Sequence, residues 1–171
     1  MPPLPRLKLP RQLESNPHHD EIEKILKQDF RPIWEESEHR VAFVPFTPAL
    51  ETALLQTRDY KGLEIGLETI QRILRIEKKG LDAVAEKQGS APAHRVSRVL
   101  IASNDGAERF YRDCEKILIN NSERLLFICV DVPSERLGEK LIGSDRSVKA
   151  LLVSDKVCVS NVLLSLAGIT T

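Results

Sequence analysis

The chain of 171 residues is poor in aromatic side chains and carries no excess charge of either sign. Aromatic residues make up only 5% of it, so its core must be aliphatic, and 42% hydrophobic residues suffice for one domain with extensions. Its 25 basic residues balance 25 acidic ones. This balance argues against a free-standing, nonspecific nucleic-acid binder, which usually carries a basic excess. A small, shape-specific RNA site, or a subunit that shares RNA contacts with partners, stays open.

Cysteines and long apolar runs are also scarce. The three cysteines, Cys114, Cys129 and Cys158, are odd in number, widely spaced and set in patterns that predict burial. They indicate reduced core thiols in a cytosolic or nuclear protein. No run approaches the roughly 18 apolar residues of a membrane span, and the N-terminus lacks the apolar region of a signal peptide. We therefore expect no membrane association.

Motifs for cofactor binding and catalysis are missing. A dinucleotide-binding loop needs several glycines after a strand, but Ser103-Asn104-Asp105-Gly106 follows the run Val96–Ala102. There is no P-loop, and none of the four histidines is placed to form a triad with Ser154-Asp155 or a metal site with further ligands. Cys129, inside an apolar run, would be a poor nucleophile. The sequence predicts no catalytic residue, no metal and no cofactor.

Short apolar runs alternate with helical patterns between Val99 and Val153 and on both sides of this stretch. Such alternation is typical of a largely parallel, buried sheet covered by helices. We predict an α/β fold, a three-layer α/β/α sandwich with a four-stranded mixed sheet and an N-terminal extension. Its strands are expected at Lys61–Ile65, Val96–Ala102, Leu125–Val130 and Val148–Val153. The run Val41–Phe46, broken by proline, is either an edge strand or a lead-in loop.

Several helix starts carry capping residues. Thr47 with Pro48 favours a helix from residue 48, and Asp20 could cap an acidic helix near residues 20–30. Asp105 with Glu108 forms a capping box for the most strongly amphipathic helix of the chain. Ser134 is expected to cap the helix that follows it.

The organisation predicted is an extension, residues 1–40, and a domain, residues 41–171, with a flexible insertion at about 78–95. Residues 1–11 hold four prolines and three basic residues, so they form either a disordered tail or an arm that docks on a partner. Trp34, the only tryptophan, either packs back on the domain or anchors a protein contact. Phe30 and Trp34 are the candidate partner-binding residues.

Two segments have the character of RNA contacts. In Gly66–Arg72 a glycine precedes a helix start, whose free amides and positive dipole end favour a phosphate. Val132–Gly138 likewise leads from a strand into a helix. The candidate RNA-binding residues are Lys61, Gly66, Glu68, Thr69, Gln71, Arg72, Pro133, Ser134, Glu135 and Arg136. Ordinary strand–helix turns with solvated charges are the alternative interpretation of both segments.

The second segment and the residues after it resemble the kink-turn-binding ribosomal protein superfamily of the L-seven-Ae and L-thirty-e type. The matching pattern is an apolar-Pro-Ser run, Leu-Gly, Gly, Arg and an apolar strand. It is carried by Val132-Pro133-Ser134, Leu137-Gly138, Gly143, Arg146, Val148 and the strand ending at Ser154-Asp155. The family motif Gly-x-Asn-Glu-Val-Thr-Lys corresponds to Gly66–Arg72, with Glu68 and Thr69 in place of the Asn-Glu pair that reads sheared G·A pairs in the family.

The long insertion and the divergent motif resemble the protein subunit of eukaryotic ribonuclease P and ribonuclease MRP, of the Pop-three and thirty-eight-kilodalton type. This resemblance implies a noncatalytic subunit of the nucleus or nucleolus that stabilises a structured RNA for tRNA or rRNA processing and contacts other protein subunits, while the RNA performs the catalysis. A protein–protein adaptor that has lost RNA binding is the alternative, and a small-molecule enzyme on the same sheet is a third.

Overall fold

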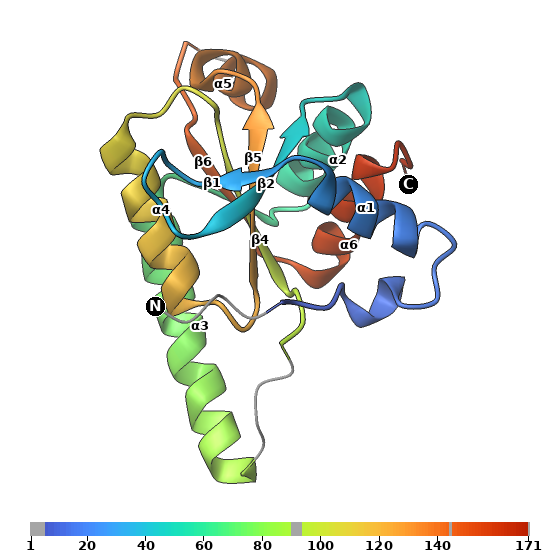
Figure 1. Ribbon diagram of the computed structural model, residues 1–171, viewed down its shortest axis with the longest axis vertical. Coiled ribbons are helices and arrows are strands. Elements are labelled where there is room, and N and C mark those ends of the chain that lie inside the picture. Colours follow the sequence, from blue (N-terminus) through green and yellow to red (C-terminus); the bar gives the residue numbers. More distant parts are fainter. Residues whose placement is uncertain (1–5, 90–93, 144, 171) are drawn as a thin grey trace.

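The computed structural model describes residues 6–89, 94–143 and 145–170. Within these residues, six strands form one sheet in the order β1-β2-β5-β4-β6-β3 (Figure 1). The strands are β1 (Phe30–Pro32), β2 (Arg40–Pro45), β3 (Leu63–Ile65), β4 (Arg98–Ala102), β5 (Leu125–Asp131) and β6 (Ala150–Val153). The helices are η1 (Arg11–Leu13), α1 (His19–Gln28), α2 (Pro48–Asp59), α3 (Leu67–Gln88), α4 (Glu108–Asn120), α5 (Ser134–Ile142) and α6 (Lys156–Leu166). No helix among the described residues is long and apolar enough to span a membrane.

The sheet is mixed, as predicted, but the described residues give it six strands and not four. Strands β2, β5 and β4 run parallel, while β1, β6 and β3 pair antiparallel with their neighbours. The additional strands are β1 and β2. Strand β2 lies in the run Val41–Phe46, for which an edge strand and a lead-in loop were the two alternatives. Strand β1 has three residues and ends in Pro32, which is too short for an alternating pattern to reveal it.

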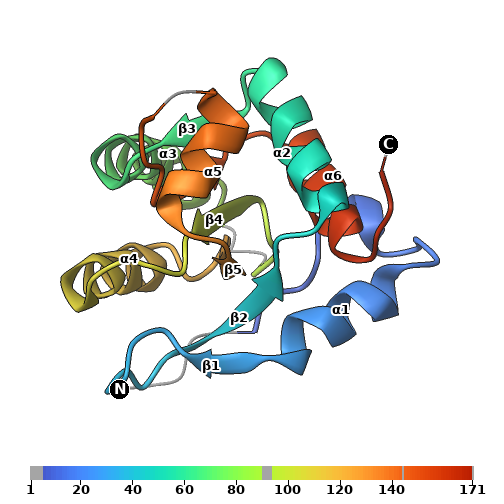
Figure 2. The ribbon, with the colours of Figure 1, turned by 90° about the horizontal axis from the view of Figure 1, so that it is seen from above.

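Helices cover both faces of the sheet, and two apolar clusters separate cleanly by strand face. Val99 and Ile101 of β4 join the cluster formed with α1, α2, α5 and α6. Leu100 and Ala102 join the cluster formed with α3 and α4. This alternation is the period of two along a strand that is buried on both faces. Seen from above, α3 and α4 lie on one side of the sheet and α2 and α6 on the other (Figure 2).

The N-terminal segment packs on the rest of the chain over the residues described. Leu9, Leu13 and Ile22 are buried in the apolar cluster formed with α1, α2, α5 and α6. Ile33 is buried in the cluster on the other face of the sheet, formed with α3 and α4. Lys8 forms an isolated bridge with Arg95, next to the start of β4. Residues 1–5, at the tip of the proline-rich segment, lie outside the described residues.

Helix α3 corrects the expected flexible insertion at 78–95. Residues 78–88 continue the helix, and it ends at Gly89, whose φ of +65° is the left-handed conformation common after helix ends. Leu81, Val84 and two alanines sustain the helix despite Gly80, which an exposed helix tolerates at about 1 kcal/mol. Of the rest of the insertion, residues 90–93 lie outside the described residues.

One of the predicted caps is confirmed and three are wrong. Thr47 accepts a hydrogen bond from the Leu50 amide, with proline at the first helical position. Helix α1 begins after His18, which leaves Asp20 inside the first turn. Helix α4 begins after Ala107 without a side-chain cap, and Ser134 is the first residue of α5, after Pro133. Asp105 instead accepts hydrogen bonds from Ser134, across the fold.

Candidate nucleic-acid interface

One edge of the sheet collects the starts of four helices. The parallel strands β2, β5 and β4 all end there, because Pro45 pairs with Asp131 and Ala102 with Cys129. Helices α2, α5 and α4 follow these strands directly. Helix α3 starts at the same edge, since the Gly66 amide donates to the Ala150 carbonyl (3.1 Å) beside the end of β4. Helix dipole ends of one sign therefore point outward along this edge, where Thr47 caps α2 and Asp105 caps α5.

The first candidate segment, Gly66–Arg72, forms the start of α3. Gly66 has a φ of +91°, a conformation that residues other than glycine rarely adopt, and none of the described side chains caps the helix. Ile70 is fully buried and holds the first turn against the core, whereas Thr69 is half-buried. Three side chains of the segment are exposed: Glu68, Gln71 and Arg72.

The second candidate segment forms the start of α5. The Ser134 amide donates to Asp105 Oδ1 (3.0 Å) and its hydroxyl to Asp105 Oδ2 (2.8 Å). Asp105 thus caps α5 from the loop after β4. Burial would raise the pKa of Asp105, but the hydrogen bonds from Ser134 and Ser103 outweigh it and hold this pKa below its usual value of 3.8. Pro133, Glu135 and Arg136 are exposed beside this capped turn.

A short main-chain segment joins the two candidates. The Val148 amide donates to the Ser134 carbonyl (2.9 Å), the Lys149 carbonyl accepts from the Ser103 amide (2.9 Å), and Ala150 accepts from Gly66. The structure therefore brings the starts of α3 and α5 to the same edge, with residues 148–150 between them. Lys149 is exposed in that bridge, and no local sequence pattern marks it, because the pairing of β3 with β6 brings it beside the start of α3.

Lys61 is not brought to this edge. The Gly62 carbonyl accepts from the Ser154 amide (2.9 Å), which places Lys61 by the far end of β3, near the start of α6. At the shared edge, Arg72, Arg136 and Lys149 form no ion pair with any described residue. The acidic Glu68 and Glu135 sit beside these basic residues, so the edge mixes donors with acceptors. Such a surface can bind phosphate oxygens and base edges selectively without a strong field of one sign.

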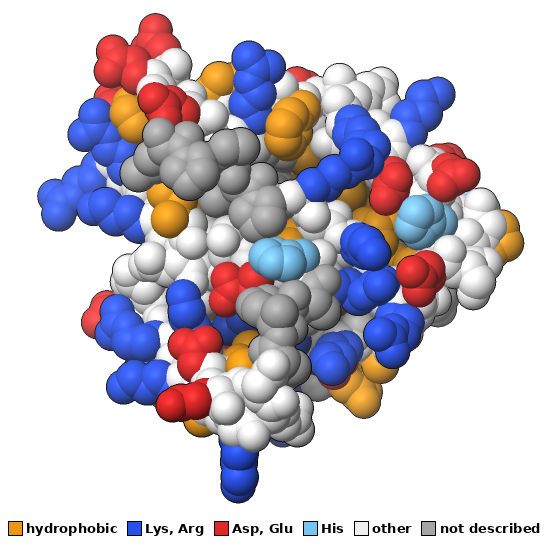
Figure 3. All heavy atoms as spheres, turned by 60° about the horizontal axis from the view of Figure 1, so that its bottom comes forward, with side chains coloured by type: hydrophobic (Ala, Val, Ile, Leu, Met, Phe, Trp, Pro, Cys, Tyr) orange, Lys and Arg blue, Asp and Glu red, His pale blue; other side chains and the backbone are white. Residues whose placement is uncertain are grey.

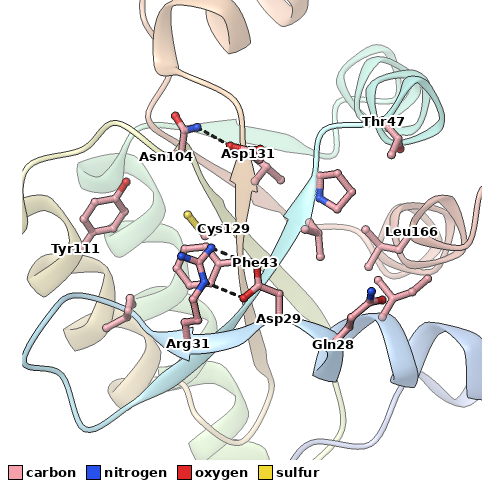
Figure 4. A pocket seen from close by; sticks show the side chains of 15 residues that line it. Gln28, Asp29, Arg31, Phe43, Thr47, Asn104, Tyr111, Cys129, Asp131 and Leu166 are labelled. Carbon is pink, nitrogen blue, oxygen red and sulfur yellow. Dashed lines mark hydrogen bonds and ion pairs between the residues drawn. The ribbon is translucent and has the colours of Figure 1, made fainter.

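A cavity of about 700 Å³ opens on the same edge, toward β1 (Figure 4). Arg31, Phe43, Asn104, Tyr111 and Asp131 are among its lining residues. Burial raises the pKa of the Tyr111 hydroxyl to about 12. Burial likewise raises the pKa of the thiol of Cys129, which lines the cavity, to about 12. Both groups stay protonated at neutral pH, so neither is an activated nucleophile.

Of the two candidate partner-binding residues, Trp34 lies against α4 and Phe30 lies on the outermost strand, β1. Trp34 donates its indole N–H to Glu115 (3.2 Å) and stacks under Arg112, whose Cζ lies 4.5 Å from the ring centroid. Trp34 therefore packs back on the domain, as in the first of the two interpretations. Phe30, on edge strand β1, is 49% exposed.

Comparisons with known proteins give structural likeness only. No protein-family model matches the chain, and no curated protein matches it in sequence. A protein of unknown function from Bacillus halodurans is 14% identical, covering 72% of this chain and 100% of its own, with a TM-score of 0.44. The Giardia lamblia 15.5kD RNA binding protein is 10% identical, covering 70% of this chain and 82% of its own, with a TM-score of 0.43. At these TM-scores neither likeness carries an argument about function.

Proposed function

We propose that this chain is a noncatalytic RNA-binding protein, which holds a structured RNA on the edge formed by the starts of α3 and α5. The observation that carries the proposal is that two segments, whose bonded residues Gly66 and Ser134 lie 68 positions apart in the sequence, are hydrogen-bonded to one main-chain bridge. Arg72, Lys149 and Arg136 supply positive charge there, and the start of α3, which no described side chain caps, supplies free amides. Phosphate contacts of this kind position RNA, and nearby polar side chains then select its shape.

We further propose that the RNA belongs to a ribonucleoprotein such as ribonuclease P or ribonuclease MRP, in the nucleus or nucleolus, with other protein subunits as partners. The support is the sequence resemblance, in which Glu68 and Thr69 replace the Asn-Glu pair of the kink-turn motif. This chain would then stabilise the RNA for tRNA or rRNA processing and leave phosphodiester chemistry to the RNA.

Binding of the full chain to three labelled RNAs tests this function: a kink-turn, a fragment of the ribonuclease P/MRP specificity region and an unrelated hairpin. Arg72→Ala and Arg136→Ala are compared with Arg11→Ala, whose arginine lies in η1, far along the chain from both segments. Each loss of a phosphate contact should lower the slope of log affinity against log salt by about 0.9. Selective binding weakened by the first two variants, and not by Arg11→Ala, is expected. Equal effects of all three would refute the proposed edge.

A protein–protein adaptor is the second candidate, and the outer half of α3 favours it. Ile76, Leu81 and Val84 are 65%, 51% and 52% exposed on this helix. Basic and acidic side chains are interspersed with apolar ones on the face shown in Figure 3, a composition compatible with a protein partner. An adaptor would bind none of the three RNAs at any salt concentration, and Leu81→Lys would abolish its co-purification with protein partners.

A further inference from the structure

The cavity of about 700 Å³ lies at a point of the topology where ligands commonly bind (Figure 4). After β4 the chain crosses to one face of the sheet through α4, whereas after β2 and β5 it crosses to the other face through α2 and α5. Loops that leave neighbouring parallel strands in opposite directions open a crevice at the carboxyl ends of those strands. Asn104 and Asp131 stand in this crevice, on the loop after β4 and at the end of β5.

A flat, fixed cationic group forms one wall of the cavity. The Arg31 guanidinium lies over the Phe43 ring, with Cζ 3.9 Å from the ring centroid. Asp29 holds it there through bonds of 2.8 and 3.3 Å to Nε and Nη2. The Arg31 side chain is still 59% exposed, so the guanidinium face turned away from the ring is available. A planar guanidinium held in this way is a stacking surface for a nucleobase.

The Asp131 carboxylate, held by Asn104, stands at another wall of the cavity (Figure 4). Asn104 Nδ2 donates to Asp131 Oδ1 (2.9 Å), which fixes both side chains. Among the described residues, neither Asp131 Oδ2 nor Asn104 Oδ1 has a hydrogen-bond partner. Asp131 follows two residues after Cys129, the register partner of Phe43, so it projects on the same face of the sheet about 7 Å further along.

Tyr111 closes the cavity from α4. Its hydroxyl donates to the Ser103 carbonyl (2.7 Å) and accepts from the Gly106 amide (3.0 Å), so the ring cannot swing into the space. Arg31 is neutralised by Asp29, and Asp131 adds one negative charge. The cavity therefore disfavours a phosphate and favours a neutral ring that presents donors.

We propose that this cavity binds a guanine base, stacked on Arg31 with its N1–H and N2 amino groups donating to the two carboxylate oxygens of Asp131, which Asn104 holds in place. Guanine presents two adjacent donors on its Watson–Crick edge. Adenine would instead turn the N1 lone pair toward the carboxylate. The base comes from an unpaired position of the bound RNA, a source that rests on the proposed function. The cavity shares the RNA edge, since the Asn104 amide donates to the carbonyl of Val132, just before Pro133.

The test uses the full chain with GMP and AMP, and with the single-stranded pentaribonucleotides UUGUU, UUAUU and UUIUU, where I is inosine. We expect GMP to bind about tenfold more tightly than AMP. The affinity of UUIUU should lie between those of UUGUU and UUAUU, because inosine keeps N1–H and loses the amino group. UUGUU binding more tightly than GMP identifies RNA as the source. GMP binding without UUGUU binding overturns the RNA source and assigns the site to a free nucleotide.

Variants separate the two walls. Asp131→Asn should abolish the guanine preference, while Asp82→Asn, on the outer half of α3, should leave it unchanged. Arg31→Lys keeps the charge and removes the planar surface, so it should weaken both purines by about tenfold and leave the preference intact. Equal binding of GMP and AMP, no binding of either, or a preference that survives Asp131→Asn overturns the proposal. Retained kink-turn binding in those cases would show that the proposed function stands without the guanine site.

Discussion

Replacing Gly138 by alanine tests how closely α5 approaches the segment that carries the RNA edge. A Cβ atom at this position would lie 1.7 Å from the Arg146 carbonyl oxygen and 2.9 Å from its carbon. Both are main-chain atoms that cannot rotate away. Helix α5 would have to move by more than about 1 Å, which strains the bond from the Val148 amide to Ser134. The same approach explains the Leu-Gly pair in the sequence pattern.

The expected magnitude follows from three opposing effects. Alanine favours a helix interior over glycine by about 1 kcal/mol. Overpacking against an immobile neighbour costs about 1–3 kcal/mol or somewhat more. Losing one main-chain hydrogen bond adds about 1 kcal/mol. We therefore expect a loss of about 1–3 kcal/mol, which lowers Tm by about 2–12 °C for a chain of this length.

Thermal and urea unfolding followed by circular dichroism measure this loss. Gly80→Ala is the matched control, because it lies in exposed helix α3 and nothing is within 4 Å of the added Cβ. The control should gain up to about 1 kcal/mol from helix propensity alone. A Gly138→Ala variant that melts at or above the wild-type temperature, while Gly80→Ala behaves as expected, would refute the packing argument.

Three further substitutions test buried or capping charges. Asp105→Asn should lower the free energy of unfolding by about 1 kcal/mol at pH 7, because it weakens the cap on α5. The pKa of Asp105 is depressed in the folded state, so the stability that its carboxylate contributes is lost in acid. Urea unfolding should therefore show the wild type losing stability, and its difference from Asp105→Asn shrinking, as the pH drops below about 3.8. Glu115→Gln should shift the fluorescence of Trp34 to longer wavelength, since the Glu115 carboxylate accepts the hydrogen bond of the indole N–H. Burial alone would raise the pKa of Glu115, but the hydrogen bonds that its carboxylate accepts lower this pKa below 4.5. Acid should therefore produce the same fluorescence shift in the wild type only below about pH 4.5. Glu77→Gln should cost about 2 kcal/mol in urea unfolding, as it leaves two partly buried arginines without their carboxylate, whereas Glu86→Gln on the same helix should be neutral.

The middle of the fold could be predicted from sequence because its strands and helices carry strong local patterns. The runs at β4, β5 and β6 are continuous and apolar, and α4 has a clear helical period. Strand β1 could not be predicted, since three residues ending in proline form a strand only by pairing with β2. The outer half of α3 has the sequence pattern of an insertion, because Gly80 and alternating charges interrupt an apolar pattern that has no core to face.

The candidate site divides in the same way. The starts of α3 and α5 were recognisable from glycine, proline and serine at the ends of apolar runs. The role of Asp105 was not, because its partner Ser134 lies 29 residues away and its local spacing to Glu108 suggested a cap that does not form. Lys149 and the Arg31–Phe43 stack also depend on strand pairing, which no local pattern encodes.

The geometry of the proposed RNA edge depends on the main chain more than on side chains. The bridge formed by residues 148–150 bonds through amides and carbonyls to the loop after β4, the start of α5 and Gly66. Substitutions at exposed positions leave these bonds intact. Glu68 and Thr69 can therefore differ from the Asn-Glu pair of the family motif that the sequence resembles without altering the main-chain shape of the proposed RNA edge, and in the proposed function they would change which base edges are accepted. Divergence at these two positions is thus expected to change RNA selectivity and to preserve the architecture of the site.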